Sequence, residues 1–307
     1  MPSAITTASS IYSTSLSSNH SKDNIRDRDQ SSQHAIVKHA VLDGHLIHPS
    51  ITSLATYPAI ADIACGHGSW LQDVYQTYGP SAAQPSLLLV GFDIDPPTIG
   101  SHLTHDIQLV QHDCTLPFPL RFIGQFDLVN INNLACSLSK EDFQKLISHA
   151  ITLLRPGGYL QWLEAEARLF RQYPTTPDFR EALYTINSER QSRGLVTDTP
   201  HFMLQEFLKY SAEGAAHTTM SILDFKLRAG GACRDGTRRH EDSNKQFSNI
   251  VMSSIQRMLA ASLERSLSGT ETAYIHCLVN AVAKDAANEN IVAGATLPYL
   301  LAQRNVQ

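Results

Sequence analysis

Four short apolar runs, each ending near a polar or acidic residue, constrain the fold of this chain more than any other feature. The runs cover residues 59–64, 86–95, 107–113 and 126–133. Segments of helical character lie between them, and a fifth run follows a Pro-Gly-Gly turn within residues 155–166. Strands that alternate with helices at this spacing indicate a parallel sheet with right-handed crossovers. The sequence therefore predicts an α/β fold.

The chain beyond residue 166 has a different, mostly helical pattern. Apolar spacing predicts helices over 199–214, 244–266 and 272–290, with strands over 219–230 and 296–304. One α/β domain with a helical insertion fits this pattern better than two independent domains. We expect a disordered Ser/Thr-rich tail at 1–33 and a domain at 34–307. Its expected parts are an N-terminal cap (34–60), a ligand-binding core (61–166), a helical substrate or lid region (167–295) and a last strand (296–304).

Composition excludes several classes of function. The 307 residues carry a formal net charge of -5 and a pI near 6.3, whereas phosphate-backbone binding needs a clustered basic surface. No apolar run approaches the roughly 20 residues that span a bilayer. The five scattered cysteines form no C-x-x-C pair, which argues against disulfides and zinc knuckles. We expect reduced thiols, a cytoplasmic protein, and neither nucleic acid nor membrane as a partner.

The stretch ADIACGHGSW, residues 61–70, predicts a tight turn between the first strand and the next helix. It fits neither a Walker phosphate loop nor a G-x-S-x-G serine elbow, and Leu71 occupies the position of the third glycine of a dinucleotide fingerprint. What remains is an acid followed by small residues: Asp62, Ala64, Gly66 and Gly68. A carboxylate there suits an ammonium group, and the helix N-terminus beyond suits a carboxylate. This predicts a zwitterionic ligand.

Two further acids end the next two strands. Asp93 can accept hydrogen bonds from both hydroxyls of a ribose, and Asp113 can accept one from an adenine amino group. The carboxyl edge of a parallel sheet is where α/β folds bind ligands. With Asp62 for an amine, the three acids predict partners for each part of S-adenosylmethionine (SAM).

At these residues the sequence resembles the class I SAM-dependent methyltransferases, and among them those of fungal secondary metabolism. The supporting stretches are residues 42–51, 61–74, 91–95 and 153–166. The resemblance implies a Rossmann-like sheet of order 3-2-1-4-5-7-6 with the last strand antiparallel. Relatives often have Gly where Ala64 stands, a mild departure that narrows the turn by one methyl group.

Site residues carry over from the family position by position. Asp62, Gly66 and Gly68 match the first motif together with Ala64, Asp93 matches the ribose acid, and Asp113 matches the adenine contact. The resemblance also implies adenine packing by Ile94, a backbone amide from Cys114, and proximity of Asn130 to the cofactor. No metal ion is expected.

Candidate catalytic residues have weaker support. His45 and His48 are spaced to share one helical face near the site, where His48 is a candidate base. Asn132 and Asn133 follow the fourth strand and can orient an acceptor hydroxyl or cap the next helix. Glu164 leaves the fifth strand beside Trp162, which can line a substrate pocket or pack in the core. These considerations select His48, Asn133 and Glu164.

Three functions remain open from the sequence. The leading one is methyl transfer to O or N of a small natural product, which implies SAM as cofactor, a small-molecule acceptor and a monomeric enzyme. The second is a SAM-binding pericyclase that cyclises its substrate without methyl transfer. The third is a non-catalytic methyltransferase-like regulator.

Overall fold

A computed structural model describes the chain over residues 45–51, 58–79, 87–96, 106–134, 137–211, 220–231, 241–263 and 267–306. The expected tail at 1–33 and most of the expected cap at 34–60 lie outside these residues, as do Cys136 and Cys233. None of the helices within the described ranges is long and apolar enough to cross a membrane.

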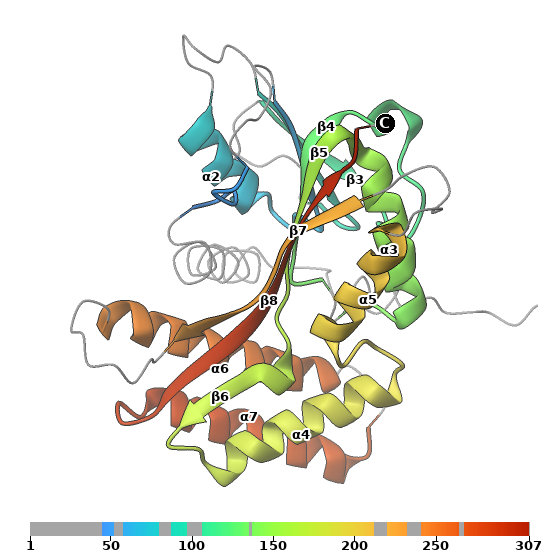
Figure 1. Cartoon of the computed structure of the whole chain (residues 1–307). Helices are drawn as coiled ribbons and strands as arrows, with labels where there is room; N and C mark the ends of the chain where they lie inside the picture. The colour runs from blue at the N-terminus through green and yellow to red at the C-terminus, as the bar shows by residue number, and fades with distance from the viewer. Residues whose placement is uncertain are drawn as a thin grey trace, which may run out of the picture.

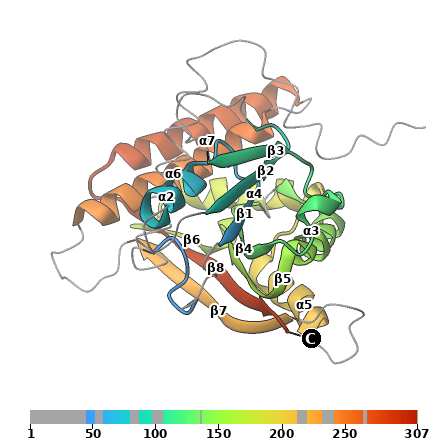
Figure 2. The ribbon, with the colours of Figure 1, turned by 90° about the horizontal axis from the view of Figure 1, so that it is seen from above.

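The first five strands form a parallel sheet in the order β3-β2-β1-β4-β5 (Figures 1 and 2). Their bounds are β1 Ala59–Ile63, β2 Leu88–Asp93, β3 Ile107–Gln111, β4 Phe126–Asn132 and β5 Leu154–Leu163. All five lie within the runs that the sequence predicts as strands, apart from the first residue of β5. The reversal of strand order at β1 places the glycine turn at the centre of the sheet's carboxyl edge.

The long strand β8, Val292–Arg304, completes the sheet and is antiparallel to β5. Strand β7, Met220–Gly231, pairs with β8 along nearly its full length, so β5 and the short β6, Phe170–Tyr173, must share the opposite edge. If the short β6 is left out of the count, β7 is the sixth strand and β8 is the seventh. The predicted strand order 3-2-1-4-5-7-6 is then confirmed. Strand β6 is an addition that the sequence analysis missed.

Alternating side chains divide the sheet into two faces. Helix α2, Ser69–Tyr78, packs with residues 46–47 on the face that carries Ile60. Helices α3, Lys140–Leu153, and α5, Thr199–Ser211, pack on the face that carries Ile63 (Figure 1). Ser139 caps α3 by accepting a hydrogen bond from the Asp142 N–H at 3.1 Å. The layered arrangement explains why the strands are apolar on both sides.

A second apolar core joins the helical region to the sheet. Helices α4, Pro177–Ser192, α6, Glu241–Ser262, and α7, Gly269–Ala287, pack against β8 and the end of β5 (Figure 1). A capping box at Ser268 begins α7. Helices α5, α6 and α7 lie at the predicted positions within a few residues, while the sequence analysis did not single out α4.

Candidate functional site

The turn after β1 depends on left-handed backbone conformations. Ala64, Gly66 and Gly68 have φ angles of 57°, 53° and 78°. Gly68 caps α2, and its N–H donates to the Cys65 carbonyl at 2.9 Å. Glycine adopts such angles without steric cost, whereas alanine does not. The left-handed backbone of the turn therefore explains why small residues occur at this spacing.

The Asp93 carboxylate joins this turn to the end of β2. Its Oδ2 accepts a hydrogen bond from the Gly66 N–H at 2.8 Å, and its Oδ1 accepts one from the Asp95 N–H at 3.0 Å. The side chain is only partly buried. Each carboxylate oxygen can accept a further hydrogen bond, so Asp93 can hold the turn and still meet a ligand.

Asp62 is a buried carboxyl beneath the turn. Its Oδ1 accepts a hydrogen bond from Asn130 Nδ2 at 2.8 Å, and no donor among the described residues contacts its second oxygen. Burial raises the pKa of Asp62 to about 7, the Asn130 hydrogen bond opposes this rise, and the nearby Asp93 charge adds to it. A cationic ligand group beside Asp62 would stabilise its carboxylate form and offset the effect of burial on its pKa.

Asp113, Cys114 and Ile94 lie at the same edge of the sheet. Asp113 Oδ1 accepts hydrogen bonds from the Thr115 N–H at 2.9 Å and the Thr115 hydroxyl at 2.7 Å. Burial raises the pKa of Cys114 to about 12, with smaller contributions from Asp113 and Asp93, so its thiol stays neutral. Ile94 is 38% exposed, and this apolar surface at the end of β2 is suited to packing against a flat ring.

A buried row of three polar side chains crosses the sheet from this site. Asp62, Asn130 and Gln161 stand directly opposite one another on β1, β4 and β5. Gln161 Nε2 donates to Asn130 Oδ1 at 3.0 Å and to the Leu46 carbonyl at 3.0 Å, and its Oε1 accepts from the His48 N–H at 2.9 Å. The sequence analysis missed Gln161, although a single amide side chain within an apolar part of a strand could have indicated a buried polar contact.

His48 lies at the end of this row, where its backbone N–H contacts Gln161 and its ring packs against Tyr299. The ring stacks on Tyr299 with a centroid distance of 5.3 Å, its Nδ1 accepts from the Ser50 N–H at 3.1 Å, and its Nε2 is 3.5 Å from Asp224 Oδ2. Residues 45–50 form bends and a turn, so the predicted helical face shared with His45 is wrong. Contacts with β5 and β8 hold this segment instead.

Asn133 and Glu164 lie close together at the ends of β4 and β5. Asn133 is exposed with a φ of 53°, and its N–H donates to the Leu163 carbonyl at 3.0 Å. Asparagine tolerates this left-handed angle better than most residues. The alternative that Asn132 or Asn133 caps the next helix is wrong, because Ser139 caps it.

The Glu164 carboxylate points into the protein. Its Oε1 accepts from Trp162 Nε1 at 2.6 Å and from the Leu134 N–H at 3.0 Å. Trp162 is fully buried and stacks on Phe143, so of its two predicted roles the structure shows core packing. Glu164 thus fixes the loop after β4.

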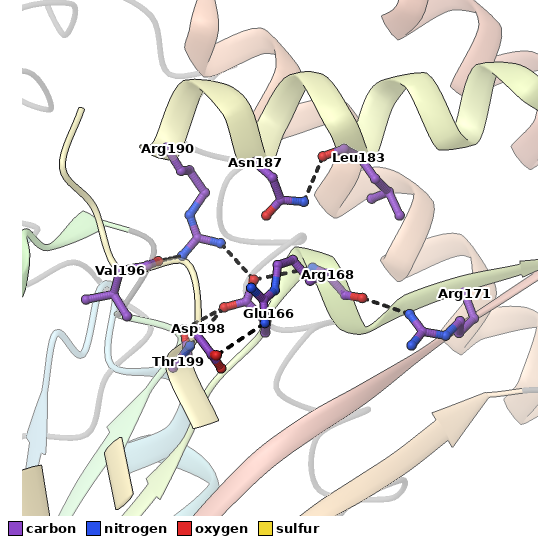
Figure 3. Close-up of polar contacts among 9 residues, drawn as sticks. All are labelled: Glu166, Arg168, Arg171, Leu183, Asn187, Arg190, Val196, Asp198 and Thr199. Atoms are coloured by element: carbon purple, nitrogen blue, oxygen red, sulfur yellow. Dashed lines mark hydrogen bonds and ion pairs between the residues drawn. The ribbon is translucent and has the colours of Figure 1, made fainter. Parts of the chain in front are cut away.

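A second buried charge cluster, which the sequence analysis also missed, follows β5 (Figure 3). Glu166 and Arg190 are buried and paired at 3.3 Å, and Arg190 also donates to the Val196 carbonyl. Glu166 Oε2 accepts from the N–H and the hydroxyl of Thr199, the first residue of α5, at 3.1 and 2.8 Å. These bonds connect the end of β5 with α4 and α5, and a carboxylate also suits the N-terminus of α5.

The Cys65 side chain fills the turn, and its thiol is not activated as a nucleophile. A Cβ added to Gly91 of β2 would lie 2.6 Å from its sulfur, which indicates close packing. Burial and the charges of Asp62 and Asp93 raise the pKa of the thiol well above its usual value. Within the described part of the chain, no group of three or more His, Cys, Asp or Glu side chains is arranged to hold a metal ion.

Part of the chain that carries this site is similar to known methyltransferases. Residues 60–158 match the family model described as a methyltransferase domain. The chain is 24% identical to methyltransferase grgD of Penicillium sp., over 75% of this chain and 78% of that protein. It is 30% identical to N-methyltransferase verN of Clonostachys rogersoniana, over 34% and 36%. The solved plantazolicin methyltransferase BpumL with SAH is 13% identical, with a TM-score of 0.45 over 97% of this chain and 93% of that one.

Proposed function

We propose, from the match of residues 60–158 to a methyltransferase domain model, that the protein is a SAM-dependent enzyme that methylates an O or N atom of a small natural product. A fungal relative named as an N-methyltransferase supports the inclusion of nitrogen acceptors. We also propose a monomer that acts on a small molecule rather than on nucleic acid or a membrane.

One observation carries this proposal: three carboxylates stand at the carboxyl ends of three adjacent parallel strands. Asp62 lies near the end of β1, Asp93 ends β2, and Asp113 follows β3, all beside the glycine turn. The amine, the ribose hydroxyls and the adenine amino group of SAM are all hydrogen-bond donors, and carboxylates are acceptors. The open oxygen of Asp62 and the exposed face of Ile94 fit an ammonium group and a base.

Asp62 would hold the ammonium group, Asp93 the ribose, and Asp113 the adenine amino group. Ile94 and the Cys114 amide would contact the base, while Ala64, Gly66 and Gly68 leave room for the methionyl part beside Asn130. When bound, SAM supplies a methyl group already activated by its sulfonium. The chain's part is then alignment and exclusion of water, and orientation of this kind contributes roughly 7–11 kcal/mol.

Three residues are proposed to act on the acceptor side. Asn133, exposed at the end of β4, is best placed to contact an acceptor group. Glu164 would position the loop that carries Asn133, through its bond to the Leu134 N–H. His48 would act through the segment that it anchors on Tyr299, rather than as a base at the reacting atoms.

The first test is SAM binding measured by calorimetry. Asp93→Ala should raise the Kd at least tenfold, because it removes a charged acceptor for two ribose hydroxyls, and each such bond contributes about 1.5–3 kcal/mol. Asp95→Ala is the matched control, since the exposed Asp95 contacts Asp93 through its backbone N–H, which alanine keeps. Equal affinity in the wild type and Asp93→Ala would contradict the proposed cofactor site.

The second test follows the methyl group. With labelled SAM and a library of amine and hydroxyl natural products, a product heavier by one methyl group supports transfer. Conversion of a substrate without methyl gain would favour the cyclase alternative. SAM binding without any turnover would favour the regulator.

A further inference from the structure

The backbone groups that contact Gln161 determine which way the amides of Gln161 and Asn130 are oriented. The amide N–H of His48 can only donate, and the carbonyl of Leu46 can only accept. Gln161 must therefore turn its Oε1 toward His48 and its Nε2 toward Leu46. The same Nε2 group donates to Asn130 Oδ1, so Asn130 must turn its own Nδ2 toward Asp62.

We propose that Gln161 is a positioning residue that, together with the backbone of residues 46–48, orients the Asn130 amide so that an N–H faces Asp62. The proposal deepens the proposed function, on which its role in cofactor binding rests. The side chains of Asp62, Asn130 and Gln161 are all buried, and each hydrogen bond of the row is 2.8–3.0 Å long. Without Gln161, Asn130 can turn over and present its oxygen to the carboxylate.

The orientation of Asn130 determines how readily Asp62 ionises. A donated hydrogen bond favours the carboxylate and lowers the pKa of Asp62, against the effect of burial. The charged group facing Asp62 from β2 is the Asp93 carboxylate, and the turn contributes the neutral Cys65 thiol. The imidazole of His48 stacks on Tyr299, and the bonds of residues 46–48 to Gln161 come from the His48 N–H and the Leu46 carbonyl.

The test replaces Gln161 with methionine, which keeps the length but has no amide. Carbon-detected NMR titration of the unliganded protein should show the pKa of Asp62 raised by about one unit, and the Kd for SAM at pH 6.5 should rise up to tenfold. Gln161→Glu, which keeps the shape but lacks the amide donors, should act in the same direction and replaces Gln161→Met if that variant does not fold. Gln172→Met, at a glutamine of β6 that is also buried, should change neither quantity.

A double-mutant cycle tests whether Gln161 acts through Asn130. In an Asn130→Ala background, Gln161→Met should change neither the pKa of Asp62 nor the Kd further. An equal effect in both backgrounds, or an unchanged pKa in Gln161→Met, would overturn the proposal. If the wild type binds no SAM, the proposed function fails, while the titration of Asp62 still decides whether Gln161 orients Asn130.

Discussion

At the scale of single residues, Ala64 is the position where the backbone of the glycine turn is strained. Its φ of 57° is one that an L-residue adopts at a cost of roughly 1–2 kcal/mol, while the neighbouring left-handed positions are glycines. Ala64, where relatives often have glycine, thus keeps the left-handed conformation at an energetic cost that glycine would avoid.

We expect Ala64→Gly to raise the free energy of unfolding by about 0.5–1 kcal/mol, because relief of strain outweighs the added freedom of the unfolded chain. Chemical denaturation measures this change. Ala61→Gly, two residues past the start of β1 and fully buried, should do the opposite. A loss of stability in Ala64→Gly would show that the methyl group makes a needed contact.

The raised pKa of Asp62 predicts a pH dependence of stability. Its ordinary value is 3.8, and its value in the fold is about 7, so between these values the folded state holds a proton that the unfolded state releases. Asp62 therefore stabilises the unliganded fold most at low pH, and this contribution falls as pH rises toward 7, by at most about 1.4 kcal/mol per unit.

Asp62→Asn should remove this slope, as measured by denaturation at a series of pH values. SAM affinity should rise with pH up to about 7, because the bound ammonium group needs the carboxylate. It should fall above about 8, where an α-amino group loses its proton. Equal slopes for the wild type and Asp62→Asn would contradict the raised pKa.

At the scale of secondary-structure elements, the Glu166–Arg190 pair connects the sheet to the helical region. Removing one partner of a buried pair leaves an uncompensated charge, which costs about 3–5 kcal/mol. We expect Arg190→Met to lose stability in this range, with Glu166→Gln/Arg190→Met recovering part of it. Denaturation of purified variants gives both values.

Arg168→Met is the control for this prediction. Arg168 and Asp198 are paired at 3.4 Å in the same cluster, but both side chains are about half exposed. Exposed pairs contribute roughly 0–1 kcal/mol. If Arg168→Met and Arg190→Met lose similar stability, burial of the Glu166 pair is not the cause.

The same scale shows what local sequence can predict. The five parallel strands, the glycine turn and the three acids follow from apolar periodicity and residue type, which are local properties. The position of Gln161 opposite Asn130 depends on strand neighbours, and its partner His48 is 113 residues away in the chain. Helical spacing at His45 and His48 was misleading, because tertiary contacts hold that segment in a turn.

At the scale of the whole molecule, β8 joins two of the three apolar cores that the described residues form. Leu300 faces the core beneath α3 and α5, whereas Leu301 faces the core of α4, α6 and α7. Truncating either should cost about 2–5 kcal/mol. Because one strand serves both cores, Leu300→Ala and Leu301→Ala should each unfold in a single transition.

Coincident midpoints by tryptophan fluorescence and far-ultraviolet circular dichroism would confirm this prediction. Fluorescence reports on Trp162 in the core beneath α3 and α5 and on Trp70 of α2, and circular dichroism is sensitive to the helices α4, α6 and α7. Two separate transitions in Leu301→Ala would show that the helical region unfolds independently.

The position of β8 also affects how the protein is made. Strands β5, β6 and β7 all pair with β8, so each keeps an open edge until residues 292–304 have left the ribosome. Unpaired edges are sites of aggregation, and long-range pairing is slow. A nascent chain stalled before residue 292 should therefore depend on chaperones far more than a chain released after residue 304.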